Sequence, residues 1–525
     1  MTERAASGGR GAFSSRNSVW LVTLAVVLTV VIPRSLMLQV SVIDWDESIY
    51  AIVAQQWVDG HVPYATAFDH KPIGLYGIFA LFILAFGDGI WAIRLIPIVF
   101  VAGTALLLTR LAHRQFENGR HLGALAAALY GLLTLTNGGL ASNTEILVNF
   151  FIVLAVCLLT GGSLDRGLSI PRSLAVGASL GAAFQVNYLA AFPILGVAAF
   201  YFFWLAPARA AGPWLHRYLG NGACMLAGFL LTGLVLLLPV FIAGDIRDYF
   251  ALQLAYLIDY HRSFDAALAL RRVSESVIVY WPFYMVSALL AASALWPRWS
   301  TRTVWDSGES ARDRRITAWL VLWACSLLAA AASGYFYHHF FLLTVPGMVM
   351  LAVAFLELAC ASGRLRNFCA LWLLLMGSAG LAQAHAELWR GFRSQRPVLG
   401  GAPVDVVARA ADYMSSRLRP SETIYVYDGQ PILYYLTHTV PPTRFAFPDS
   451  HLLPHLARRF GFTPEEKVRE VLASGPRFVV ARPRVAAGEL SEAGLILYDA
   501  LDRDYTPASA QDERGPSNIF ERKSR

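Results

Sequence analysis

Long apolar runs alternate with short polar segments from residue 19 to about residue 384. The first run, residues 19–40, is too long for the core of a secretory signal peptide and has no small-residue cleavage site after it, so it predicts a retained membrane helix. The later runs of membrane length are residues 90–111, 121–138, 145–161, 172–187, 189–205, 220–243, 276–296, 315–333, 339–358 and 367–384. The pattern predicts about eleven transmembrane helices.

Two segments interrupt this pattern. Residues 73–87 form an apolar run of about fifteen residues that is short for a full crossing and contains Gly74 and Gly77, which predicts a membrane-surface or re-entrant segment. Residues 244–275 mix aromatic and apolar positions with charged ones, including Tyr260, His261 and Arg262, which favours one or two helices in the membrane interface. This second segment either contributes to a site or only caps a helix bundle.

Beyond residue 385 helical and strand patterns alternate. The stretch VDVVARAADYMSSRLR has the period of an amphipathic helix, and ETIYVYDG and PRFVVARP read as strands. The expected organisation is a disordered cytoplasmic segment over residues 1–18, a transmembrane catalytic domain over 19–384 with a first outer loop at about 41–89, and a small α/β domain over 385–525. The α/β domain has no Gly-rich phosphate loop and no nucleophile elbow, so we expect the chemistry elsewhere and no nucleotide cofactor.

Composition narrows the class. With 56% hydrophobic and 15% charged residues and a mean hydropathy of +0.49, the chain is predicted to be an α-helical polytopic membrane protein. The net charge of +7 comes from Arg residues scattered between apolar runs, without a basic patch interleaved with aromatics, so no nucleic-acid partner is expected. The five cysteines lie in or beside apolar runs without a CxxC motif, which predicts neither a disulfide framework nor a zinc site.

Charge concentrates in one stretch, residues 44–72, directly after the first apolar run. Here Asp46 is predicted to cap a helix that ends at Gly60 and lies flat on the membrane, with the Asp46 and Glu47 carboxylates at the water boundary. Asp69, His70 and Lys71 follow at once. Carboxylates that abstract a proton and a cation that binds phosphate suit a transferase. The alternative is an ordinary surface helix with capping acids.

Other boundary residues have more than one interpretation each. The pair His338-His339 in GYFYHHFF suits phosphate or metal binding, or structural hydrogen bonding. Arg94 either reaches phosphate, pairs with an acid, or extends to the interface with its charged end in water. Glu145 in ASNTE either contacts an acceptor or metal, or caps the helix that begins there.

The Asp46-Glu47 pair after the first helix, the DHKP motif, the multi-span body and the soluble tail together resemble the GT-C glycosyltransferases, and in particular bacterial relatives of protein O-mannosyltransferases and lipid A aminoarabinose transferases. The resemblance implies that a sugar moves with inversion from a polyprenyl-phosphate donor to a lipid, glycan or protein acceptor at the membrane.

The resemblance also implies residue roles. Asp46 would be the general base, and Glu47 would orient the acceptor or hold a metal; whether a divalent metal ion takes part stays open. The implied donor-phosphate ligands are Lys71, His338, His339 and Arg94. The implied acceptor or metal candidates are Asp69, His70, Glu145, Tyr260, His261 and Arg262. The chain departs from the pattern in FQVNYLA, where Gln185 and Asn187 stand and relatives often have a lysine.

Loop charges predict the orientation. With an N-terminus in the cytoplasm, residues 73–87 not crossing and eleven crossings, the cytoplasmic loops carry about 17 Arg and no Lys, and the outer loops about 5 Lys and Arg. The candidate residues and the α/β domain then share the outer face, the periplasm of a bacterial inner membrane. A flippase for lipid-linked sugars is the alternative function, disfavoured because the acids lie in boundary loops and no inverted repeat is visible; an inactive assembly subunit is a third.

Overall fold

The computed structural model describes residues 18–116, 119–161, 168–204, 214–243, 246–247, 249–250, 253, 265–300, 311–359, 363–394, 405–445, 461–482, 490–508 and 518–523. These residues form two compact units. The first unit comprises Met1–Ser35, Ile96–Leu238 and Leu254–Leu388, and the second comprises Leu36–Leu95, Pro239–Gln253 and Trp389–Arg525. The predicted disordered segment falls, up to residue 17, outside the described residues, as do Tyr260, His261 and Arg262.

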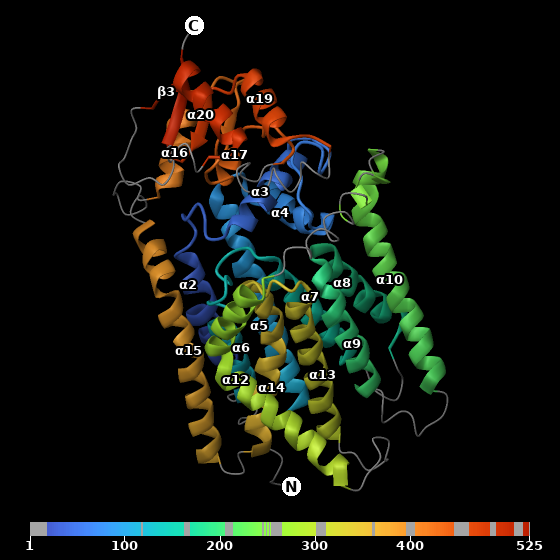
Figure 1. Cartoon of the computed structure of the whole chain (residues 1–525). Helices are drawn as coiled ribbons and strands as arrows, with labels where there is room; N and C mark the ends of the chain where they lie inside the picture. Colours follow the sequence, from blue (N-terminus) through green and yellow to red (C-terminus); the bar gives the residue numbers. More distant parts are fainter. Residues whose placement is uncertain are drawn as a thin grey trace, which may run out of the picture. The chain divides into compact units, whose positions relative to one another are not determined.

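The first unit is built of apolar helices (Figure 1). The span His338–Glu357, which joins η5 and α14, is the most buried of the candidate membrane spans among the described residues, at 89%, and α14 packs against α6, α12 and α13. The helices and helical turns that lie in this unit wholly or for most of their length are η1 (Val27–Val31), α2 (Ile32–Ser35), α5 (Ile90–Gln115), α6 (Gly119–Leu133), α7 (Thr144–Leu159), α8 (Ile170–Val186), η2 (Tyr188–Ala190), α9 (Ala191–Trp204), α10 (Trp214–Ile242), α12 (Ala266–Ser300), α13 (Ala311–Ala332), η5 (His338–Thr344), α14 (Val345–Ala359) and α15 (Gly363–Ser394).

Glycines let two of these helices approach closely. A Cβ atom at Gly177 of α8 would collide with the carbonyl of Met225 on α10, and one at Gly228 of α10 would collide with the carbonyl of Leu174 on α8. Small residues at such crossings are a common way to pack apolar helices where lipid removes the hydrophobic driving force.

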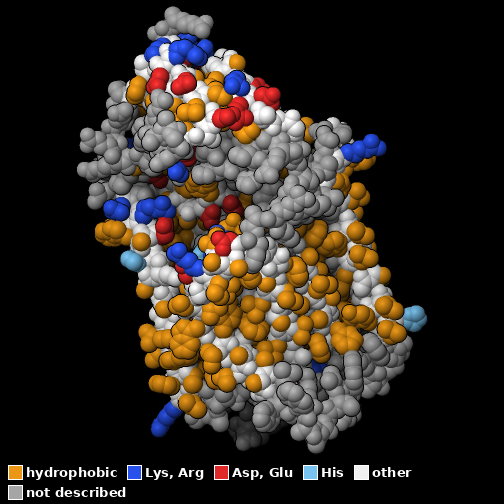
Figure 2. Space-filling view, in the orientation of Figure 1, with side chains coloured by type: hydrophobic (Ala, Val, Ile, Leu, Met, Phe, Trp, Pro, Cys, Tyr) orange, Lys and Arg blue, Asp and Glu red, His pale blue; other side chains and the backbone are white. Residues whose placement is uncertain are grey.

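Seven helices among the described residues are long and apolar enough to cross a membrane. They are Ser18–Ser35, Ile90–Gln115, Leu215–Ile242, Ala266–Ala294, Asp313–Ala332, His338–Glu357 and Arg364–Ser394. Apolar side chains also cover most of the visible surface of the helical unit (Figure 2). The chain is therefore a multi-pass membrane protein.

The other four predicted spans correspond to shorter helices. α6, α7, α8 and α9 have 15, 16, 17 and 14 residues. At a rise of about 1.5 Å per residue they extend about 21–26 Å, less than the roughly 30 Å of a hydrocarbon core. The predicted number of eleven crossings stays a prediction.

The second unit combines short helices with a four-stranded sheet (Figure 1). Its strand order is β1-β2-β4-β3, with β1 and β2 parallel and the other two neighbouring pairs antiparallel. The stretches predicted as strands contain β1 and β2, and α16 lies in the predicted amphipathic helix. The elements of this unit are α3 (Trp45–Val58), α4 (Ile73–Phe86), α16 (Val406–Ser415), β1 (Ile424–Val426), α17 (Ile432–Leu436), α19 (Pro464–Ser474), β2 (Phe478–Ala481), α20 (Glu492–Asp504), β3 (Tyr505–Pro507) and β4 (Asn518–Arg522).

The sheet has its own apolar core, formed where α19 and α20 pack against one another and against the strands. Its central side chains include Val468, Val479, Leu497 and Leu501, each at most 2% exposed. α15 runs on to Ser394, past residue 385 where composition placed the start of the soluble part.

Candidate active site

The N-cap residue of α3 is Asp44, two residues before the predicted cap at Asp46. The Asp44 Oδ1 accepts a hydrogen bond from the Asp46 backbone N–H at 3.2 Å, and Glu47 Oε1 accepts from the Asp44 N–H at 3.3 Å, which together form a capping box. The prediction that Asp46 caps this helix was wrong, because DWDE has capping-box spacing from Asp44 to Glu47. Asp46 lies in the first turn instead.

α3 is also not a surface helix. Every residue from Glu47 to Gln56 is buried, and the helix packs against α4 and α17 of the same unit. Gln55 Nε2 donates to the Tyr435 carbonyl at 3.1 Å. The prediction of a surface helix with one apolar face is therefore wrong, since all faces of its middle are covered by protein. That the helix lies flat on the membrane stays a prediction.

Glu47 forms a buried ion pair with Arg94. Arg94 Nη1 lies 2.5 Å from Glu47 Oε2, and each side chain is at most 1% exposed. Arg94 also donates to the carbonyls of Val40 and Ser41, at 2.8 and 2.9 Å. Of the three interpretations of Arg94, pairing with an acid is the one that the structure shows. The pair fixes the segment that leads into α3.

Asp46 is half-buried and less engaged than Glu47. Its Oδ2 accepts from the Tyr50 hydroxyl at 3.4 Å, and its Oδ1 has no hydrogen-bond partner among the described residues. A carboxylate oxygen that accepts no hydrogen bond within the protein can accept a proton from a bound hydroxyl group.

Asp69 anchors the DHK loop that precedes α4. Its Oδ1 lies 2.8 Å from His70 Nδ1, and its Oδ2 accepts from the Tyr76 hydroxyl at 2.8 Å. Burial raises the pKa of Asp69, but the charges of His70 and Lys71 and the hydrogen bonds from His70 and Tyr76 outweigh it, and the net pKa lies below the ordinary value. Asp69 is therefore a buried anion that organises the loop.

Lys71 presents a cation from that loop. Its carbonyl accepts from Tyr64 Oη at 3.0 Å and from Gln253 Nε2 at 3.3 Å, and Gln253 also donates to the Asp69 carbonyl at 3.4 Å. The Lys71 side chain is 8% exposed, and its ammonium group makes no hydrogen bond or ion pair with any described residue. Sequence reasoning missed Tyr64, Tyr76 and Gln253, since nothing in the local pattern marks their partners.

Two tyrosines connect the clusters around Asp46 and Asp69. The ring of Tyr50, which donates to Asp46, contacts the ring of Tyr76, which donates to Asp69, edge to face with centroids 6.4 Å apart. The first turn of α3 and the loop before α4 are thus neighbours in one unit.

In the first unit, Glu145 and Asn187 come together. Glu145 Oε1 accepts from Thr144 Oγ1 at 3.0 Å and from Asn187 Nδ2 at 3.2 Å, and the Glu145 side chain is 1% exposed. Asn143 is the N-cap residue of α7, so Glu145 lies inside the first turn and is not its cap. Asn187, noted for replacing a lysine, instead supplies an uncharged donor to this carboxylate.

The histidine pair lies at the start of η5, before α14. His338 Nε2 is 3.2 Å from Glu275 Oε2, and His338 Nδ1 is 3.2 Å from Ser276 Oγ. His339 stacks on Tyr337 with centroids 5.7 Å apart, and Arg272 lies over the Tyr337 ring at 4.3 Å. Glu275 is a partner that sequence reasoning missed. Within the described ranges no three His, Cys, Asp or Glu side chains gather as metal ligands.

Comparison with known proteins shows similarity in sequence to one family and to one relative. The model of the dolichyl-phosphate-mannose-protein mannosyltransferase family matches residues 69–242. The undecaprenyl phosphate-alpha-4-amino-4-deoxy-L-arabinose arabinosyl transferase of Pseudomonas aeruginosa (strain UCBPP-PA14) is 27% identical over 300 residues, which cover 53% of this chain and 49% of that protein. The match thus spans about half the length of this relative.

Solved structures extend the likeness over the fold. ArnT from Cupriavidus metallidurans bound to undecaprenyl phosphate superposes with a TM-score of 0.58 at 15% identity, over 96% of this chain and 97% of that one. Its apo state gives a TM-score of 0.54 at 15% identity, with the same coverage.

These likenesses show that the chain is a multi-pass membrane protein with the fold of the ArnT structures. The sequence is similar to the protein mannosyltransferase family and to the aminoarabinose transferase, which confirms the resemblance predicted from its residues.

Proposed function

We propose that the chain is a membrane glycosyltransferase that moves one sugar from a polyprenyl-phosphate donor to an envelope acceptor. The observation that supports this most is the Tyr50–Tyr76 contact. It brings the Asp46 carboxylate, whose Oδ1 has no hydrogen-bond partner among the described residues, near the loop that carries Lys71. The Lys71 ammonium group forms no ion pair with any described residue. A base and a phosphate-binding cation in one small region are what a glycosyl transfer from a lipid phosphate needs.

In the proposed reaction, an acceptor hydroxyl oxygen attacks the anomeric carbon as the bond from that carbon to the phosphate oxygen breaks. Asp46 takes the hydroxyl proton, and Lys71 stabilises the negative charge on the departing polyprenyl phosphate. One direct displacement inverts the configuration at that carbon. No step of this reaction is assigned to a metal ion.

Other residues serve by position in this proposal. Glu47 and Arg94 hold the start of α3, and Asp69 and His70 hold the loop that presents Lys71. Glu145, His338 and His339 stay proposed contacts for acceptor or donor, and Tyr260, His261 and Arg262 stay sequence predictions. The acceptor is a lipid, glycan or protein.

We also propose the finer topology. About eleven crossings place the C-terminal α/β domain and the Asp46 and Lys71 region on the outer face of a bacterial inner membrane. Lipid-linked donors suit that face because nucleotide sugars are confined to the cytoplasm.

The experiment is transfer from a polyprenyl-phosphate sugar by purified protein in lipid vesicles. Asp46→Asn should lower turnover by about 10²–10⁴ while donor binding is retained, since an amide keeps the shape but takes no proton. Lys71→Ala should weaken donor binding and slow turnover together. Asp59→Asn is the matched control, because this exposed carboxylate lies at the other end of α3. Turnover near that of wild type in Asp46→Asn would remove Asp46 from the mechanism.

A further inference from the structure

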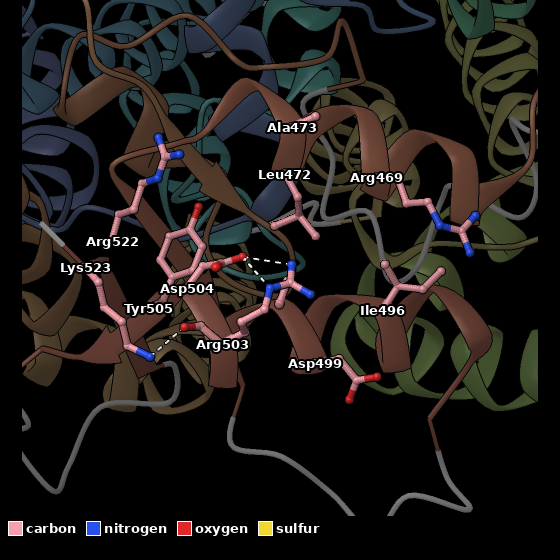
Figure 3. A pocket seen from close by; sticks show the side chains of 11 residues that line it. Arg469, Leu472, Ala473, Ile496, Asp499, Arg503, Asp504, Tyr505, Arg522 and Lys523 are labelled. Carbon is pink, nitrogen blue, oxygen red and sulfur yellow. Dashed lines mark hydrogen bonds and ion pairs between the residues drawn. The ribbon is translucent and has the colours of Figure 1, made fainter. Parts of the chain in front are cut away.

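A cavity of about 620 Å³ lies beside the sheet of the second unit, between α19 and α20 (Figure 3). Its walls come from these two helices, from β3 and from the end of β4. No residue of this cavity has a part in the function proposed above. Its volume falls in the range of about 300–1,000 Å³ that is usual for small-molecule sites.

Part of the cavity wall is apolar. Leu472 and Ala473 of α19 line it together with Ile496 of α20, and Tyr505 stands at the end of α20 (Figure 3). Ala500 of α20 also lines the cavity. Tyr505 is 5% exposed, and its hydroxyl donates to the Pro476 carbonyl at 3.0 Å, so the ring is fixed in place. An apolar wall of this kind, with Leu472 and Ile496 in it, suits the C–H face of a sugar ring.

The rest of the wall carries more positive than negative charge. Four cationic side chains stand against the two carboxylates of Asp499 and Asp504. The cationic side chains are Arg469, Arg503, Arg522 and Lys523. One of the carboxylates, that of Asp504, is already paired with Arg503 at 2.9 Å. The lining therefore keeps a positive excess.

Two of these cations are held by the backbone. Arg522 Nη1 donates to the Gly475 carbonyl at 3.0 Å, at the end of α19. Lys523 Nζ donates to the carbonyls of Asp502 and Arg503, at 3.1 and 2.7 Å, in the last turn of α20. Such contacts fix a charged group without removing its charge, although the helix C-termini offset part of it. Arg469 makes no hydrogen bond or ion pair with any described residue.

We propose that this cavity binds an anionic sugar, one that carries a phosphate or a carboxylate group. The apolar wall contacts the sugar ring, and Arg469 with the neighbouring cations binds the anionic group, for which guanidinium groups offer paired donors. On the proposed function, the anionic sugar is part of the acceptor. The C-terminal domain then adds acceptor selection to a catalytic region that contains none of these residues.

The test is binding to the full-length protein in phosphatidylcholine nanodiscs, with glucose 1-phosphate, glucuronate and glucose as probes. Glucose 1-phosphate, glucuronate or both should bind at least tenfold more tightly than glucose, and the one that binds identifies the anionic group. Replacing Arg469 and Arg503 together by Ala should remove that preference. Arg417→Ala is the control, because Arg417 lies just after α16 and stacks on Tyr413 outside the cavity.

Three outcomes would overturn the site: equal binding of glucose and the anionic probes, unchanged binding by the double variant, or competition by inorganic phosphate as strong as that by glucose 1-phosphate. Unfolding midpoints of the variants establish that each is folded. Asp46→Asn should bind the probes as wild type does, so the site and the proposed function fail or survive separately. In the transfer assay the double variant should raise the acceptor KM and leave kcat unchanged.

Discussion

The second unit contains a buried ion pair, Glu47–Arg94, whose loss should lower its stability. Each side chain is at most 1% exposed, so removing one partner leaves an uncompensated buried charge. Arg94→Met should lower the free energy of unfolding by about 3–5 kcal/mol, measured as a lower midpoint of thermal unfolding in detergent.

A matched control for Arg94→Met is Arg271→Ala, which breaks the exposed pair with Glu275 and should hardly change the unfolding midpoint, because water already solvates both charges. The double variant Glu47→Leu with Arg94→Met should recover part of the loss, because no lone charge remains. If Arg94→Met and Arg271→Ala unfold at the same temperature, the pair does not stabilise the unit.

Asp69 links stability to pH. Its folded pKa lies below the ordinary value of 3.8, so its ionised form stabilises the fold above about that pH, and this stabilisation is lost as the pH falls through the lower folded value. Tyr76→Phe removes one of the hydrogen bonds that lower the pKa, so acid unfolding should begin at a higher pH. The readout is the unfolding midpoint from pH 7 to pH 3. Asp69→Asn, the control, should flatten this acid limb, and identical curves for Tyr76→Phe and wild type would contradict the assignment.

The charged candidate residues could be predicted from the sequence, but the residues that they contact could not. Asp46 and Lys71 stand out because charge is rare in this chain. Arg94 pairs with Glu47 across a separation that spans all of α3 and α4, and no local pattern announces such a contact. Gln253 is similar, since an uncharged residue in a long polar interruption gives no sign that it contacts the DHK loop.

At the scale of elements, the stability of α3 can show whether Asp44 or Asp46 is its N-cap residue. Asp44→Ala should cost about 0.5–2 kcal/mol, because Asp44 supplies the acceptor for the first free N–H groups of the helix. Asp46→Ala should change the unfolding midpoint little, because Asp46 caps nothing. Thermal unfolding of the two variants side by side decides between them, and the reverse order would restore Asp46 as the cap.

Periodicity predicted most helices but misplaced α3 and could not decide how many helices cross. α3 was predicted as a surface helix because Ile49, Val53 and Trp57 repeat at four-residue spacing, and that spacing does not show that its polar residues Gln55 and Gln56 are buried as well. The apolar runs 121–138 and 145–161 continue past the last helical residues, which are Leu133 in α6 and Leu159 in α7. Apolar composition alone does not mark where a helix ends.

At the scale of the whole molecule, the loop charges predict the orientation of the chain in the membrane, and a labelling experiment can test it. α4 and α9 have 14 residues each, so helix length does not decide which of them crosses, and the loop charges carry the prediction. Leaving α4 out keeps about 17 Arg in one set of loops and about 5 Lys and Arg in the other, an asymmetry that counting it as a crossing would invert. The sheet of the second unit then faces outward.

The test uses single cysteines in a chain whose five native cysteines are replaced by Ala, and a membrane-impermeant thiol reagent on intact cells. Ser416 and Ser491 are exposed positions of the sheet domain, and Ser169 is an exposed position before α8. Ser48 is unsuitable although it lies two residues after Asp46, because it is fully buried. Cysteines at Ser416 and Ser491 should react in intact cells, and one at Ser169 should react only after the membrane is permeabilised. Reaction of Ser169→Cys alone in intact cells would invert the orientation and move the sheet domain to the cytoplasm, where a periplasmic acceptor cannot reach the cavity between α19 and α20.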